Sequence, residues 1–165
     1  MPALTAATKA PDFSLTGIDG KKFNLQDALK QGLVVAAFFK VSCPVCQYAF
    51  PFLERVHKAH GDPKVTIVGI SQDDKRSTGA FLKEYGVTFP ALLDDPNGYA
   101  VSNAYGLTNV PTWFLIGQDG EIEISSVGWV KKDIEDLNRK LSDVQKTPPP
   151  QLFKPGEEIH DFRAG

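Results

Sequence analysis

Two long apolar stretches predict the centre of a β-sheet. Leu33–Phe39 is apolar throughout, and Val65–Ser71 is mostly apolar and rich in β-branched residues. Runs of this length and composition are typical of strands that are buried on both faces. Trp113–Ile116 predicts a third strand, and the turn Asp119-Gly120 joins it to the alternating strand Glu121–Val127.

Shorter strands are predicted on either side of this centre. Phe13-Ser14-Leu15 and Phe23-Asn24-Leu25 alternate between apolar and polar residues, and the turn signal Asp19-Gly20 lies between them, so they predict an N-terminal hairpin. Phe89–Leu93 predicts one more short strand. Pro90 within it indicates a sheet edge or a bulge, because proline cannot donate a hydrogen bond to a neighbouring strand.

The clearest helix follows the first apolar stretch. Ser42 is expected to cap it, Pro44 is tolerated in its first turn, Pro51 should kink it, and Gly61 should end it. The apolar residues that recur at helical spacing are Val45, Ala49, Phe52, Leu53 and Val56. Further helices are predicted at Gln26–Lys30, at Ser77–Tyr85, at Tyr99–Tyr105 and over the positions Ile134, Leu137 and Leu141.

This order of elements predicts an α/β fold with a central mixed sheet flanked by helices. We expect residues 1–146 to form one domain. Residues 147–165 open with a run of prolines and continue as a mostly polar stretch, which predicts an extended or disordered tail. Docking of the tail onto the domain through Phe153, Ile159 and Phe162 is the alternative.

Composition and charge exclude several classes of function. The 165 residues are 42% hydrophobic and 23% charged, as in one globular domain. The net charge of -2 offers no basic field to nucleic acid or anionic membrane, and no apolar stretch approaches the roughly 18 residues of a membrane span. Residues 1–10 lack the pattern of a signal peptide, so we expect a cytoplasmic protein, with a periplasmic or secreted mature form as the alternative.

Both cysteines lie in one motif, Cys43-Pro44-Val45-Cys46, between the first apolar strand and the helix. A helix N-terminus or a nearby cation favours the thiolate, so Cys43 is the expected attacking residue, with Lys40 and Ser42 tuning its ionisation. Cys46 lies one turn further along, and we expect it to face inward and to displace the substrate from Cys43. The pair therefore predicts thiol–disulfide exchange.

Three other interpretations of the pair stay open. A structural disulfide would close too short a loop to constrain much of the unfolded chain. A zinc site needs about four ligands, so a second subunit would have to supply the missing ones. The third interpretation is a buried, unreactive pair. The position at a strand end and a helix start favours the redox interpretation.

Several segments match one known family: Ala10–Leu15, Phe38–Cys46, Pro51, Val110-Pro111-Thr112 and Val127-Gly128. On these segments the chain resembles the TlpA-like thiol–disulfide oxidoreductases of the redoxin (alkyl hydroperoxide reductase/thiol-specific antioxidant) superfamily, which have the thioredoxin fold. The resemblance covers about Ala10–Leu141. In this comparison Ser77–Leu93 corresponds to a helix and strand inserted in the TlpA-like branch.

The resemblance implies a cis peptide bond before Pro111, which would bring Val110 beside Cys43 and let its backbone pair with an extended substrate segment. The residues expected to contact substrate are Val110, Pro111, Thr112, Pro44 and Trp129. The resemblance further implies no metal and no cofactor beyond the redox-active disulfide. We expect a monomer that exchanges with protein or small disulfides and dithiols and uses a separate electron donor.

The chain also departs from the family pattern. Pro44-Val45 stands between the cysteines where thioredoxin has Gly-Pro, so the reductant and oxidant directions both stay open. Ala37 and Ala49 occupy the positions at which thioredoxin and TlpA-type relatives carry an acid that accepts the proton of the second cysteine. We therefore predict slow release of substrate from the mixed disulfide at neutral pH, or a route in which water mediates the proton transfer from Cys46.

A thioredoxin-dependent peroxidase is the first alternative function. Peroxiredoxin chemistry needs the pattern Pro-x-x-x-Thr/Ser-x-x-Cys and an arginine that binds peroxide. The corresponding positions hold Phe39 and Cys43 in one register and Ala36 and Lys40 in the other. Arg55 is available, but we expect it to be a solvated surface charge. Neither register therefore fits a peroxidase.

A Cu(I)-binding protein of the thioredoxin fold is the second alternative. Thiolates suit Cu(I), but thioredoxin-fold copper chaperones have three residues between their cysteines and a distant histidine ligand. This chain has two residues between its cysteines. We expect His57 and His60 to face solvent, and His160 lies in the tail.

Overall fold

The computed structural model describes residues 3–61 and 64–165, so residues 1–2 and 62–63 of the predicted domain lie outside the described residues. The strands are β1 (Ser14–Gly17), β2 (Lys22–Asn24), β3 (Leu33–Phe39), β4 (Val65–Ser71), β5 (Ala91–Leu93), β6 (Thr112–Ile116), β7 (Ile122–Val127), β8 (Trp129–Val130) and β9 (Phe162–Arg163). The helices are α1 (Leu25–Gln31), α2 (Pro44–His60), α3 (Lys75–Glu84), α4 (Ala100–Ala104) and α5 (Lys131–Gln145).

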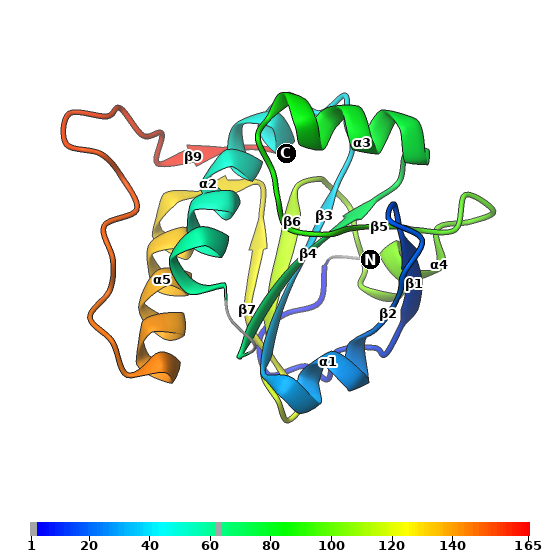
Figure 1. Ribbon diagram of the computed structural model, residues 1–165, viewed down its shortest axis with the longest axis horizontal. Helices are drawn as coiled ribbons and strands as arrows, with labels where there is room; N and C mark the ends of the chain where they lie inside the picture. Colours follow the sequence, from blue (N-terminus) through cyan, green and yellow to red (C-terminus); the bar gives the residue numbers. More distant parts are fainter. Residues whose placement is uncertain (1–2, 62–63) are drawn as a thin grey trace.

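Within the described residues, seven strands form one mixed sheet in the order β2-β1-β5-β4-β3-β6-β7. Helices cover both faces of the sheet (Figure 1): α2, α3 and α5 contribute to one core, and α1 contributes to the other. This is the α/β arrangement that the sequence predicts. None of the helices in the described part of the chain has the length and apolar character needed to cross a membrane.

Strand β3 forms the centre of the sheet because every one of its residues is apolar and buried. Alternate side chains enter opposite cores: Val35 and Phe39 join α2, α3 and α5, whereas Val34 and Phe38 join α1. β3 pairs in parallel with β4 and antiparallel with β6. Since parallel strands end at the same sheet edge, the loops after β3 and β4 leave the sheet side by side.

The inserted segment differs from the prediction at Pro90. The strand begins at Ala91, one residue after this proline, and it lies between β1 and β4, so it is not an edge strand. The Pro90 carbonyl accepts a hydrogen bond from the Gly69 N–H at 2.9 Å. Proline can make this bond because it uses the carbonyl oxygen and not the missing N–H. Phe89 remains outside the strand and packs against Phe50, with ring centroids 5.7 Å apart.

Residues 147–165 form no helix and lie against the domain. Leu152 is buried, and Phe153 and Ile159 pack on the core that contains α2 and α5, whereas Phe162 is 63% exposed. The sequence analysis missed β9, which pairs antiparallel with β8. Figure 1 shows this segment passing along α5 and returning across α2.

Candidate active site

Cys43 caps α2, one residue later than predicted. The helix begins at Pro44, and the Cys43 Sγ accepts a hydrogen bond from the Cys46 N–H at 3.2 Å. Ser42 is exposed and precedes the cap, so the prediction that Ser42 caps this helix is wrong. The physical reason is that the chain leaves β3 with Cys43, rather than Ser42, facing the free N–H groups of the first turn.

Cys43 also faces the loop that contains the predicted proline. Its Sγ donates a hydrogen bond to the Val110 carbonyl oxygen, with a sulfur–oxygen distance of 3.4 Å. The Val110–Pro111 peptide bond is cis, as the resemblance implies. The Thr112 hydroxyl donates to the Asn109 carbonyl at 2.7 Å and closes this loop. The sulfur thus lies between a helix N-terminus and a backbone carbonyl.

Cys46 lies underneath, and both cysteines are free thiols. Burial, followed by the contact with the Cys43 side chain, raises the pKa of the Cys46 thiol far above its ordinary value of 9.0. A hydrogen bond from the Lys40 backbone acts in the opposite direction. The Cys46 thiol is therefore protonated at neutral pH and has to lose its proton before it can attack a disulfide.

The acidic residue that approaches Cys46 is one that the sequence analysis missed. Ala37 and Ala49, which replace the usual acids, are both buried in the core. Asp73 follows β4, and its carboxylate accepts the Val41 N–H at 2.8 Å. Its negative charge is one of the causes that raise the pKa of Cys46. The sequence signal that could have identified Asp73 is its position directly after β4, a buried strand that runs parallel to β3.

The other predicted site residues lie at different depths. Lys40 is exposed and lines a hollow of about 270 Å³ together with Val110 and Asn109. Pro44 is exposed on the first turn of α2. Trp129 is 1% exposed, so it does not present its ring to solvent. The structure brings Cys43, Cys46, Val110 and Pro111 together and leaves Trp129 beneath the tail.

Residues near the end of the tail contact two aromatic side chains of the domain. The Trp129 Nε1 donates to the His160 carbonyl at 2.6 Å, and the His160 N–H donates to the Tyr48 hydroxyl at 3.1 Å. The Arg163 guanidinium lies over the Tyr48 ring, 5.0 Å from its centroid. Tyr48 is a second residue of this region that the sequence analysis did not single out.

Two polar side chains are placed differently from the predictions. Arg55 is not a solvated charge: both of its terminal nitrogens bond the Glu157 carboxylate at 2.7 Å, and it donates to the Leu152 carbonyl. His60 does not face solvent, because its ring is buried between the side chains of Asn138 and Gln145. Both residues connect α2 to distant parts of the chain.

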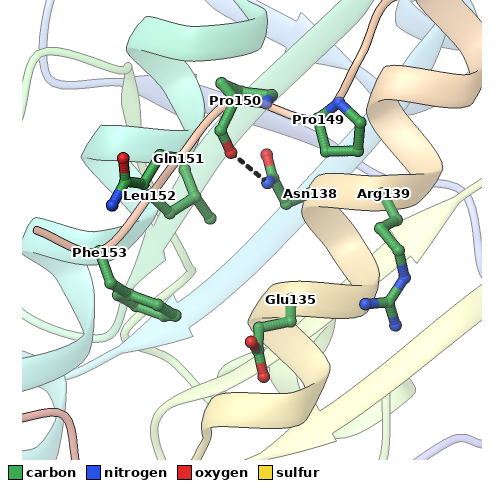
Figure 2. A pocket seen from close by; sticks show the side chains of 8 residues that line it. All are labelled: Glu135, Asn138, Arg139, Pro149, Pro150, Gln151, Leu152 and Phe153. Carbon is green, nitrogen blue, oxygen red and sulfur yellow. Dashed lines mark hydrogen bonds between the residues drawn. The ribbon is translucent and has the colours of Figure 1, made fainter. Parts of the chain in front are cut away.

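Another hollow, of about 330 Å³, lies between α5 and residues 149–153. Figure 2 shows Asn138 pointing at the tail there, where its amide donates to the Pro150 carbonyl at 2.8 Å. None of the residues that line this hollow belongs to the predicted site. Across residues 3–61 and 64–165, no group of three or more His, Cys, Asp or Glu side chains is arranged to hold a metal ion.

Comparison with known proteins agrees with this geometry. The AhpC/TSA family profile matches residues 6–125. The thiol-disulfide oxidoreductase ResA of Geobacillus kaustophilus is 30% identical over 144 residues, which cover 87% of this chain and 80% of the relative. The thioredoxin-like protein YneN of Bacillus subtilis is 31% identical over 137 residues, covering 81% of this chain and 76% of the relative.

Solved structures give the same result. A thiol:disulfide interchange protein of the thioredoxin family from Chlorobium tepidum is 26% identical, with a TM-score of 0.69 over 86% of this chain and 98% of that chain. The thioredoxin domain of a Bacteroides vulgatus thiol-disulfide oxidoreductase, 21% identical, has a TM-score of 0.74 over 84% of this chain and 98% of that chain. The fold is therefore thioredoxin-like. With its paired cysteines at the start of α2, the chain is a thiol–disulfide oxidoreductase and belongs to the AhpC/TSA family.

Proposed function

We propose that Cys43 is the attacking residue and Cys46 the resolving residue of this enzyme. The observation that carries the proposal is the position of the Cys43 Sγ, half-buried between the first turn of α2 and the Val110 carbonyl, with Cys46 buried below it. A sulfur at a helix N-terminus and within reach of substrate is suited to attack, whereas a buried thiol is suited to intramolecular displacement.

The exchange then has two steps. The Cys43 thiolate bonds to one substrate sulfur and releases the other as a thiolate. Cys46 loses its proton and attacks the Cys43 sulfur, which releases the second substrate thiolate and leaves a Cys43–Cys46 disulfide. Two electrons pass to the substrate, and a separate dithiol donor restores the enzyme. The reverse sequence oxidises a dithiol.

We propose protein disulfides as the main substrates, with small disulfides as a second class. The Val110 backbone beside Cys43 offers a strand-like partner to an extended segment, as in the addition of a strand to a sheet edge. Pro44 is exposed and contributes to the same surface, whereas Pro111 and Thr112, which were also expected to contact substrate, are buried and support the Val110 loop from below. In this scheme the redox-active disulfide is the only redox group, and the enzyme acts as a monomer.

The compartment is part of the proposal. We propose the cytoplasm, with an exported mature form as the alternative. Fractionation of cells that express the native protein tests this choice. Recovery of the protein with a cytoplasmic marker supports the cytoplasm, and recovery with an extracytoplasmic marker supports the exported mature form.

Trapping of the mixed disulfide tests the roles of the two cysteines. Cys46→Ser should hold substrate proteins on Cys43, which appear as covalent complexes on non-reducing gels and disappear with dithiothreitol. Cys43→Ser is the matched control and should trap few or none. Trapping by Cys43→Ser instead of Cys46→Ser would reverse the roles, and failure of the wild type to reduce insulin disulfides would contradict the proposed function.

A further inference from the structure

Residues 160–165 run beside the candidate active site. Figure 1 shows these residues, in red, next to the first turn of α2. The tail reaches this place from an anchor upstream, where Leu152 is buried and Arg55 binds Glu157 with two hydrogen bonds. The anchor holds residues 160–165 at high effective concentration near Cys43.

The backbone of this segment is paired as an added strand. Arg163 lies opposite Trp129, and Phe162 lies opposite Val130, in an antiparallel pair. The Lys131 N–H donates to the Asp161 carbonyl at 2.9 Å, which extends the same pairing. Such main-chain pairing is how extended peptides join a sheet edge.

The segment then reaches the carbonyl that faces Cys43. A Cβ added to Gly165 would overlap the Val110 oxygen, the same atom that accepts from the Cys43 Sγ. The Asn109 amide donates to the Gly165 carbonyl at 3.1 Å. On the other side, a Cβ added to Gly128 would lie 2.5 Å from the Arg163 oxygen, so this close approach requires glycine.

The tail's own side chains contribute little to this contact. Phe162 is 63% exposed, and the ring of His160 and the guanidinium of Arg163 both contact the Tyr48 ring, at 5.3 and 5.0 Å from its centroid. Main-chain pairing, hydrogen bonds between domain side chains and the tail backbone, and these two ring contacts make a modest, reversible association. A surface that binds mainly backbone also accepts strands of other sequences.

We propose that residues 160–165 occupy the position that an extended segment of a protein substrate takes beside Cys43, and that a protein substrate has to displace them. The inference rests on the proposed function. Protein substrates meet a competitor that is covalently linked to the enzyme. A small disulfide needs only the Cys43 sulfur and no strand pairing, so the same competitor affects it little.

The test keeps the full chain and replaces residues 160–165 with alternating Gly and Ser, which form flexible coil. kcat/KM is measured for insulin disulfides with dithiothreitol as reductant. For 5,5′-dithiobis(2-nitrobenzoic acid), which dithiothreitol reduces directly, the second-order rate constant is measured with the pre-reduced enzyme and no added thiol. We expect the insulin value to rise about fivefold or more, because the competent fraction of the enzyme increases. The value for the small disulfide should change less than about twofold.

A point variant gives an independent test that disturbs the fold less. Arg163→Ala removes the contact with Tyr48 and should raise the insulin value about twofold without changing the small-disulfide value. Lys83→Ala removes an exposed cation from α3, away from the tail and its anchor, and is the matched control. The inference is overturned if kcat/KM for insulin is unchanged in both the Gly/Ser variant and Arg163→Ala. It is also overturned if the rates for insulin and for the small disulfide change equally. If no form of the enzyme reduces either disulfide, the proposed function itself fails.

Discussion

The Cys46 thiol is kept protonated by its surroundings, and this decides how the two cysteines share the reaction. Its side chain is fully buried, and its pKa is raised by burial first and by Cys43 second. Asp73 adds a negative charge nearby, and no acid stands at the position of Ala37 or Ala49. At this scale we therefore predict that the attack by Cys46 is the slow step.

The first prediction concerns stability against alkali. Because the folded state raises the pKa of Cys46 above 9.0, the unfolded chain releases this proton at a lower pH than the folded protein does. The free energy of unfolding of the reduced protein should therefore fall as pH rises above about 9, by up to about 1.4 kcal/mol per pH unit. Urea unfolding from pH 7 to 10 measures this. The oxidised protein has no Cys46 thiol and is the control; an equal fall in both forms would contradict the prediction.

The second prediction concerns the rate of resolution. After Cys43 reacts with 5,5′-dithiobis(2-nitrobenzoic acid), release of the second thionitrobenzoate reports the attack by Cys46. This release should be slow at pH 7 and should accelerate about tenfold per pH unit, because the reacting thiolate increases in that proportion.

Asp73→Asn should accelerate this release at pH 7, since it removes a negative charge that raises the pKa of Cys46. The side-chain amide oxygen of this variant can still accept a hydrogen bond from the Val41 N–H. Asp74→Asn is the matched control, because Asp74 caps α3 and asparagine caps equally well. Slower release in Asp73→Asn would show instead that the Asp73 carboxylate accepts the Cys46 proton.

Among the elements, β3 and α2 position the site through close packing. β4 lies parallel to β3, and its Gly69 faces the rings of Phe39 and Phe50. A Cβ added at Gly69 would lie 3.0 Å from Phe39 and 3.4 Å from Phe50. These rings fill the space between the sheet and α2, so the glycine sets how closely the active-site helix approaches the sheet.

The third prediction compares two glycines. Gly69→Ala should lower the free energy of unfolding by about 1–3 kcal/mol, because the Phe39 ring has to move. Gly79→Ala, inside α3 with no atom within 4 Å of the added Cβ, should raise it by up to about 1 kcal/mol through helix propensity. Urea unfolding of the reduced proteins measures both. Destabilisation by both variants to the same extent would contradict the packing argument.

For the whole molecule, the contact that joins the tail to the domain is the pair Arg55–Glu157. The hydrogen bonds from Arg55 lower the pKa of Glu157 to about 2. Because this pKa is depressed below its ordinary value of 4.5, the carboxylate favours the docked tail above about pH 4.5 and loses this effect as pH falls towards 2. The tail should thus stay docked at neutral pH.

The fourth prediction tests this anchor. In Glu157→Gln the amide cannot form the charged pair, so chymotrypsin should cleave after Phe153, which packs on the core in the docked tail, faster at pH 7 than in the wild type. Glu158→Gln changes an exposed neighbour and should leave the cleavage rate unchanged. An NMR titration of the Glu157 carboxyl gives its pKa directly. A wild-type value near 4.5, or equal cleavage in the two variants, would contradict the anchor.

Local patterns account for what could be predicted from the sequence. β3, the cysteine pair and α2 are adjacent in the chain, so an apolar run, a motif and a helical period were enough to place them. The cis bond at Pro111 needed the family resemblance, because an isolated X-Pro bond is rarely cis. The helix cap was wrong by one residue because serine is a common cap and cysteine is not.

Contacts between distant residues account for what could not be predicted. Arg55 and Glu157 each occupy a position that is polar in sequence, and nothing in the local pattern pairs them. β9 has two residues and no alternation, so its pairing with β8 has no local signal. Asp73 reaches the cysteines only because β4 lies beside β3. These features depend on the assembled fold.

The pairing of β3 with β6 has a consequence during translation. After Leu33–Phe39 has left the ribosome, one of its edges can pair with β4 once Ser71 has emerged. Its other edge stays unpaired until Thr112–Ile116 has been synthesised. During that interval a fully apolar strand presents unpaired N–H and C=O groups to the cell. Nascent chains that stall between these two points should therefore be the ones that chaperones hold and that aggregate when chaperones are scarce.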